Sequence, residues 1–250
     1  MKWWLAGWWL MAGCGRIAFD PIDQRIDGDG GTVDVIDEPA AFVQIQAPPY
    51  ASAPSQSVMI DLTAGHLVVA AVYWDQTPNT VTLADTAGLT WTAAPKYEIP
   101  AVCGGSTGNA TGAQLYYAQV SSPVMTTVTV SQTSGAQPLG VMLVEYAGLA
   151  MTNVVEAESG QVAPSASNAM FVPSFTTTRD TMVVVFFNET LGSGTMTEGS
   201  GYTARARITG FPNMYEDALL PPGMYIPSGA LPAGQTDACW VGDAIALRTL

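Results

Sequence analysis

Short apolar runs, separated by clusters of Gly, Pro, Asn, Asp and Ser, fill the chain from about residue 41 to its end. At residues 128–131 the order Val-Thr-Val-Ser alternates apolar and polar side chains, which is the period of a strand with one buried face. No stretch of about twelve residues carries the apolar stripe of an amphipathic helix. The pattern therefore predicts strands at residues 42–46, 57–62, 67–74, 80–84, 89–93, 113–120, 125–131, 139–147, 153–157, 170–175, 181–187, 202–208 and 239–248.

Two of these predicted strands contain continuous apolar runs. Residues 67–74 read Leu-Val-Val-Ala-Ala-Val-Tyr-Trp, and residues 182–187 read Met-Val-Val-Val-Phe-Phe. Runs of this kind are typical of central strands that are buried on both faces. Many short strands with loop signals between them predict an all-β chain, folded as a β-sandwich or a jelly roll.

The chain also shows signs of an internal duplication. Residues 65–74 resemble residues 179–188, the turn around Gly88 resembles the turn around Gly201, and residues 141–146 resemble residues 241–247. The offsets are 114, 113 and about 100 residues, which is the length of a domain and not of a solenoid repeat. Two arrangements fit, two small sandwiches or two halves of one sandwich. A single domain over residues 41–250 is favoured because no linker divides the halves.

The first thirteen residues have the organisation of a secretory signal peptide. Lys2 precedes an apolar run rich in Trp, and the small residues Ala12 and Gly13 follow it. The run is too short to cross a hydrocarbon core of about 30 Å, which needs about 20 residues. Residues 1–13 are therefore predicted to direct export.

The sequence Met11-Ala12-Gly13-Cys14 resembles the lipobox of bacterial lipoproteins. The resemblance implies that the peptide is cut before Cys14, that the Cys14 sulfur carries diacylglycerol, and that the new amino group is acylated. Two or more acyl chains hold a protein stably on a membrane. Leu is usual where Met11 stands, and Gly15, in place of the Asp that signals inner-membrane retention, favours the outer membrane.

Residues 14–40 are predicted to be an acidic tether between the lipid and the folded domain. Residues 15–40 hold seven acids and two arginines and show no sustained periodicity. Asp27, Asp29 and Glu38 occupy positions 1, 3 and 12 of a calcium-loop pattern, but Gly31 and Thr32 stand where a ligand and the turn glycine belong. We therefore predict no metal site there.

Lipid on Cys14 would leave an even number of cysteines in an oxidising compartment. Cys103 and Cys239 then either form a disulfide that closes a loop of more than 130 residues or remain as two buried thiols.

Several features of residues 57–248 resemble a recurrent, uncharacterised bacterial surface β-sandwich domain. They are a buried strand that ends at Trp74, a Thr-x-x-Asp-x-x-Gly-x-Thr segment from Thr82 to Thr90, a Tyr-Tyr strand at 116–117, Val-Glu-Tyr-x-Gly-Leu at 144–149, and Ala-Leu-Arg at 246–248. The resemblance implies a structural scaffold and brings no catalytic residue with it. His66 departs from it, since an acid or Asn is more usual there.

The composition excludes several function classes. The formal net charge of −13 disfavours nucleic acid as a ligand. The sole histidine, His66, precedes a buried strand, no Gly-x-Ser-x-Gly elbow occurs, and zinc needs more His or Cys ligands than the chain offers. No phosphate-binding loop is followed by Lys and a helix, so no cofactor is predicted.

Paired carboxylates are the remaining route to catalysis, since glycosidases use two of them. The candidates are Glu145, Glu156, Glu158 and the pair Glu216 and Asp217. Because Glu145 lies within an apolar strand, we expect burial to raise its pKa. The sandwich resemblance implies instead a structural part for Glu145 beside Tyr146.

A binding surface is predicted from aromatic residues at strand ends and in loops, where rings can stack on sugars or pack against a partner. Residues 210–237, rich in Pro, Gly and Tyr, have few strand signals and are predicted to be a long functional loop or a cover over one sheet edge. The residues proposed for the surface are Trp91, Tyr97, Phe211, Tyr215 and Tyr225. The sequence thus predicts a lipid-anchored, exported β-sandwich that serves adhesion, envelope structure or glycan recognition, with a glycan or another envelope protein as partner; the alternative is a carbohydrate-active enzyme on the same scaffold.

Overall fold

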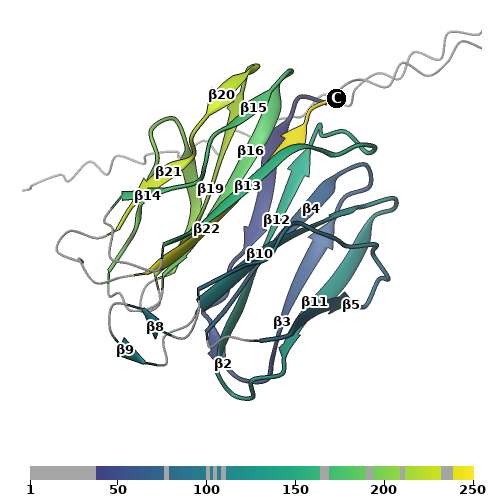
Figure 1. Ribbon diagram of the computed structural model, residues 1–250. Coiled ribbons are helices and arrows are strands. Elements are labelled where there is room, and N and C mark those ends of the chain that lie inside the picture. The colour runs from purple at the N-terminus through teal and green to yellow at the C-terminus, as the bar shows by residue number, and fades with distance from the viewer. Residues whose placement is uncertain are drawn as a thin grey trace, which may run out of the picture. The chain divides into compact units, whose positions relative to one another are not determined.

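The computed structural model describes residues 38–75, 79–99, 102–103, 106–107, 111–163, 169–189, 194–208, 212–231 and 239–250, with the backbone alone at 102–103 and 106–107. The described residues form an all-β fold of antiparallel sheets (Figure 1), as the sequence predicted, and fall within one compact unit. None of them belongs to a helix with the length and apolarity that a membrane span requires. The predicted signal peptide and the tether up to residue 37 lie outside the described residues.

The first half of the fold is a sandwich of two sheets. The larger sheet has the strand order β1 (Ala41–Gln46), β12 (Pro138–Ala147), β4 (Leu67–Asp75), β10 (Thr111–Gln119) and β6 (Thr92–Ala93); β2 (Ala51–Ser52) also pairs with β12, and β7 (Tyr97–Glu98) with β10. The smaller sheet has the order β3 (Ser55–Leu62), β11 (Val124–Gln132) and β5 (Val81–Asp85). A two-stranded ribbon, β8 (Val102–Cys103) with β9 (Ser106–Thr107), completes this half.

The second half repeats this topology. Its larger sheet has the order β13 (Val155–Ala163), β22 (Trp240–Arg248), β16 (Thr181–Glu189), β19 (Asn213–Leu220) and β18 (Thr203–Ile208). Opposite it lie β14 (Ala169–Phe171), β21 (Ser228–Ala230) and β17 (Thr197–Glu198), together with the pair β15 (Phe175–Thr177) and β20 (Gly223–Tyr225). In both halves the chain passes back and forth between two sheets, and this passage gives a jelly-roll-like sandwich.

Each half has a glycine in its last long strand, opposite an aromatic residue of the central strand. Gly140 of β12 faces Tyr73 of β4, and Gly242 of β22 faces Phe187 of β16. A Cβ atom at Gly140 would lie 2.0 Å from the Tyr73 ring, and one at Gly242 would lie 2.7 Å from the Phe187 ring. The Tyr73 ring faces the core between the repeats, whereas the Phe187 ring faces the smaller sheet of its own repeat.

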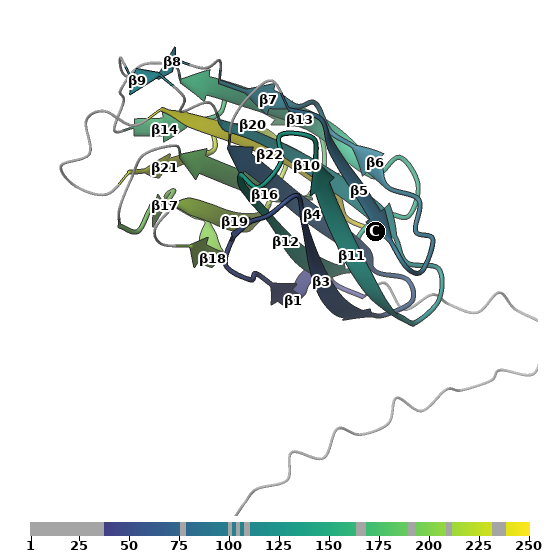
Figure 2. The same cartoon turned by 90° about the horizontal axis from the view of Figure 1, so that it is seen from below.

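The two larger sheets pack face to face, so the fold has four layers (Figure 2). Leu67, Val69, Ala71 and Tyr73 of β4 point to the core shared by the repeats, whereas Val68, Ala70, Val72 and Trp74 point to the smaller sheet of their own repeat. β16 divides its side chains in the same way. Burial on both faces explains why these two strands are apolar at nearly every position.

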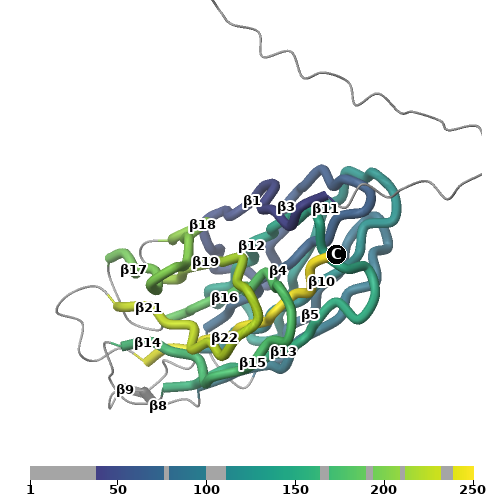
Figure 3. Tube along the Cα trace, turned by 90° about the horizontal axis from the view of Figure 1, so that it is seen from above, coloured from purple at the N-terminus to yellow at the C-terminus, as the bar shows by residue number. Residues whose placement is uncertain are grey.

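Polar contacts also join the repeats across this shared core. The Tyr146 hydroxyl donates to the Asp217 carboxylate at 2.7 Å, and Arg205 pairs with Asp217 at 2.9 Å. The Arg205 guanidinium also lies 4.3 Å from the centre of the Phe42 ring, where β18 runs beside β1 (Figure 3). A buried carboxylate that binds one residue of each repeat fixes the register of one sheet against the other.

The sequence prediction was wrong for residues 210–237. This segment contains β19, a strand between β16 and β18, and also the short strands β20 and β21. β19 lacks a strand-like pattern because Glu216 and Asp217 interrupt it, yet both side chains are buried. The predicted strand at 170–175 is divided between β14 and β15, and most of the predicted strand at 89–93 is loop.

Candidate functional site

A groove of about 390 Å³ lies at one end of the first repeat, where the β5–β6 loop, the end of β10 and the β10–β11 turn meet. This volume is within the usual range for small-molecule sites. The lining residues carry no charge and offer hydroxyl groups, an amide and one aromatic ring: Ala87, Gly88, Leu89, Thr90, Thr92, Tyr117, Ala118, Gln119, Ser121, Ser122 and Val124.

Asp85, at the end of β5, holds the loop that forms one wall. Its carboxylate accepts hydrogen bonds from the backbone N–H groups of Ala87 at 2.7 Å and Leu89 at 3.1 Å, and from the Trp91 indole at 2.9 Å. Burial raises the Asp85 pKa, but the hydrogen bonds from Trp91, Leu89 and Ala87 outweigh it, so the pKa is lowered. Asp85 therefore stays ionised and fixes the loop before any ligand arrives.

Gly88 gives this loop its shape. Its φ is 74°, in the left-handed region that favours glycine. On the opposite wall, the Gln119 side chain donates to the carbonyl of Met151, which ties the end of β10 to the segment after β12. Both walls of the groove are thus fixed by contacts within the protein.

Among the predicted aromatic residues that the structure describes, only Trp91 lies at the groove. Its neighbours Thr90 and Thr92 line the space, while the Trp91 ring packs against the core of the first repeat. The sequence pattern thus indicated this loop and its Asp, but not the role of Asp85, which depends on backbone N–H groups that a side-chain pattern does not reveal.

The other predicted aromatic residues do not form one surface. Tyr215 is fully buried between the repeats, so its assignment to an accessible surface was wrong. Tyr97 packs against Gly160 of β13, and Tyr225 packs against the core of the second repeat and donates to the Pro221 carbonyl. Phe211 lies outside the described residues.

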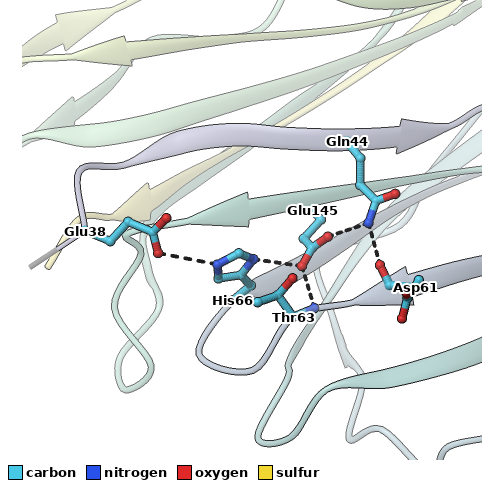
Figure 4. A network of polar contacts seen from close by, with 6 residues as sticks. All are labelled: Glu38, Gln44, Asp61, Thr63, His66 and Glu145. Atoms are coloured by element: carbon cyan, nitrogen blue, oxygen red, sulfur yellow. Dashed lines mark hydrogen bonds and ion pairs between the residues drawn. The ribbon is translucent and has the colours of Figure 1, made fainter. Parts of the chain in front are cut away.

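Glu145, the first catalytic candidate, is the centre of a buried network (Figure 4). It accepts hydrogen bonds from the Gln44 amide at 2.6 Å, the Thr63 N–H at 2.7 Å and His66 Nδ1 at 2.7 Å. The other His66 nitrogen, Nε2, lies 3.4 Å from the Glu38 carboxylate. The network thus joins β1 and β12 to the turn between β3 and β4.

The expected pKa shift of Glu145 was wrong in sign. Burial does raise the pKa, but the hydrogen bonds from Gln44, Thr63 and His66 are together stronger, so the net shift is downward. Glu145 is therefore an ionised, fully engaged acceptor. A general acid would need a raised pKa and access to a substrate.

The remaining carboxylates are dispersed. Glu216 and Asp217 are neighbours on β19 and point to opposite faces: Glu216 accepts from Gly199 N–H at 3.0 Å, whereas Asp217 pairs with Arg205. Glu156 accepts from the Thr178 N–H and hydroxyl at 2.6 Å, and Glu158 is exposed on the same edge strand. None of the four lines the groove.

The cysteine and metal predictions have different outcomes. Cys14 lies outside the described residues, and Cys103 is described by its backbone alone in β8, whereas Cys239 is buried directly before β22. Their pairing stays a prediction. Among the described residues no group of three or more His, Cys, Asp or Glu side chains is placed to hold a metal ion.

Comparison of the chain with protein-family models, with curated proteins and with solved structures finds no match.

Proposed function

We propose that this protein is an exported lipoprotein, anchored through Cys14, whose folded body has a binding or structural role at the cell envelope: adhesion, envelope structure or glycan recognition. The observation that carries the proposal is the groove of the first repeat, which has preformed walls and an uncharged, hydroxyl-rich lining. Sites of this composition suit recognition, since rigid walls reduce the entropy lost on binding.

The positions of the acids support binding over hydrolysis by paired carboxylates. Glu145 already accepts three hydrogen bonds within the protein. Glu216 points to Gly199 in the second repeat, whereas Asp217 points to Tyr146 in the core between the repeats. A glycosidase needs two carboxyl groups about 5–10 Å apart on either side of an accessible bond. A screen of neutral and acidic glycans should give binding without release of reducing ends. Hydrolysis that requires Glu145, Glu156, Glu158, Glu216 or Asp217 would contradict the proposal.

The anchor is tested by Cys14→Ser. Because a Ser side chain takes no thioether-linked lipid, we expect the variant to leave the membrane fraction and appear in the soluble fraction. Met11→Leu, which restores the residue usual at this place in the lipobox, is the matched control and should remain with the outer membrane. A Cys14→Ser protein that sediments with membranes as the wild type does would refute the anchor.

We also propose a disulfide between Cys103 and Cys239. Lipid on Cys14 leaves these two cysteines, and both β8 and the start of β22 lie at the lower left of the fold in Figure 1. The bond would tie the ribbon of the first repeat to the last strand of the second.

A further inference from the structure

The groove has a counterpart at the same corner of the second repeat. The β5–β6 turn around Gly88 corresponds to the β17–β18 turn around Gly201, and the two glycines have φ angles of 74° and 86°. Each turn begins at an acid, Asp85 or Glu198, and ends at a threonine, Thr90 or Thr203. The two turns thus share an acid, a glycine in the left-handed region and a threonine at matching positions.

In the second repeat, tyrosine side chains occupy this corner. Tyr202 follows Gly201 where Leu89 follows Gly88, and it packs against the core beside Tyr225. The Tyr225 ring covers Gly223, at which a Cβ atom would lie 2.9 Å from the Tyr225 hydroxyl. That hydroxyl donates to the carbonyl of Pro221 in the adjoining turn. The corner of the second repeat is thus filled by hydroxylated six-membered rings from the chain itself.

The first repeat has smaller side chains at this corner. Leu89 stands in place of Tyr202, and Thr126 is the third residue of β11 where Tyr225 is the third residue of β20. The β10–β11 turn contains Ser121 and Ser122 where the second repeat has Pro221 and Pro222. The groove occupies the space that remains. Ser, Thr and Gln119 are among its lining residues, and none of the lining residues is charged.

We infer that the groove binds a neutral sugar unit of a glycan, which takes the place that tyrosine rings fill in the second repeat. This assignment rests on the proposed binding role and names its ligand class. A pyranose has the size and shape of a six-membered ring, an apolar face for Tyr117 and hydroxyl groups for Thr90, Thr92 and Ser122. An acidic sugar would gain no cationic partner from this lining.

Trp91 provides a specific reporter for occupancy. In the exported form that begins at residue 14, the tryptophans are Trp74, Trp91 and Trp240, and both Trp74 and Trp240 are buried. Only Trp91 is partly exposed, and it lies between two groove residues. A ligand in the groove should therefore change the fluorescence of Trp91, and this change should be absent in Trp91→Phe.

The decisive experiment substitutes two exposed serines, one at a time, in the exported Cys14→Ser protein. Ser122→Trp fills the groove, whereas Ser55→Trp places the same side chain on β3, outside the lining residues. The probes are neutral oligosaccharides of glucose, galactose and N-acetylglucosamine, titrated by calorimetry. We expect Ser122→Trp to weaken binding about tenfold or more, and Ser55→Trp to leave it unchanged.

Two results would overturn the assignment, and they bear differently on the proposed function. Equal affinity of the wild type and Ser122→Trp would place the glycan site elsewhere and leave the binding role intact. If the protein binds none of the probes, and Cys14→Ser is the only variant that leaves the envelope, the sugar ligand is refuted and a structural role at the envelope remains. Cleavage of a probe would contradict the proposed function itself.

Discussion

Glu145 illustrates how far a single residue can be understood from its neighbours in sequence. Its place in an apolar strand was predictable, and so was its burial. The sign of its pKa shift was not, because Gln44 and Thr63 reach it from positions 101 and 82 residues away in the chain. A buried carboxylate with such partners behaves as a structural acceptor, whereas the same carboxylate without them would resemble a catalytic acid.

Glu145→Gln should destabilise the fold by about 2–3 kcal/mol, because an amide nitrogen replaces an oxygen that accepts a buried hydrogen bond. Since the folded-state pKa is lowered, the contribution of Glu145 is present above its unfolded pKa and is lost as pH falls through the folded value. Urea unfolding at neutral pH measures the effect. Glu38→Gln, on the exposed side of His66, is the matched control and should cost less than about 0.5 kcal/mol. Equal losses for the two variants would contradict this account.

At the scale of the elements, strands with regular patterns were predictable, and strands that bury charge were not. The predicted strand at 67–74 matches β4 closely, and the one at 181–187 matches β16, because an unbroken apolar run has one simple explanation in a layered fold. The sequence did not predict β19, because its two acids are paired only in the folded protein. Asp217 pairs with Arg205, and Glu216 accepts a hydrogen bond from the Gly199 N–H. The loop that Asp85 holds was recognisable by its Asp and Gly, but the groove beside it requires the β10–β11 turn, which lies more than 30 residues later.

The proposed disulfide is a prediction about two elements, since it would join β8 to the start of β22. Cross-linking a loop of more than 130 residues restricts the unfolded chain and should stabilise the fold by about 4–5 kcal/mol. Mass spectrometry of unreduced peptides should show one peptide pair that contains Cys103 and Cys239. Reduction should lower the midpoint of urea unfolding. Two free thiols in the exported protein would show that the elements are not linked.

For the whole molecule, the buried acids dictate how stability depends on pH. Burial raises the pKa of Asp75 to about 7 and the pKa values of Glu216 and Asp243 to about 8. In the unfolded chain these groups titrate near pH 4, so between the two values the folded state binds more protons. The free energy of unfolding should therefore be greatest in weakly acidic solution and fall as pH rises to about 8.

Asp243→Asn tests this dependence, because Asn keeps an acceptor for the Leu115 N–H but cannot ionise. The variant should lose less stability than the wild type between about pH 5 and about pH 9, as measured by urea unfolding across that range. Asp61→Asn removes one exposed charge and serves as the control. A wild-type stability that rises over the same range would contradict the prediction.

The face-to-face packing of the larger sheets has a consequence for ancestry. A chain with a single repeat would expose Leu67, Val69, Tyr73 and Tyr146 along a whole sheet, and such a chain needs a second copy to cover that face. A twofold dimer of that kind must carry the same side chains at both corners. Fusion of the two copies removes this constraint and makes the association intramolecular. In the fused chain, the corner of the second repeat can be closed by its own tyrosines while the groove of the first repeat stays open. Two identical subunits cannot differ in this way, because every substitution appears in both of them.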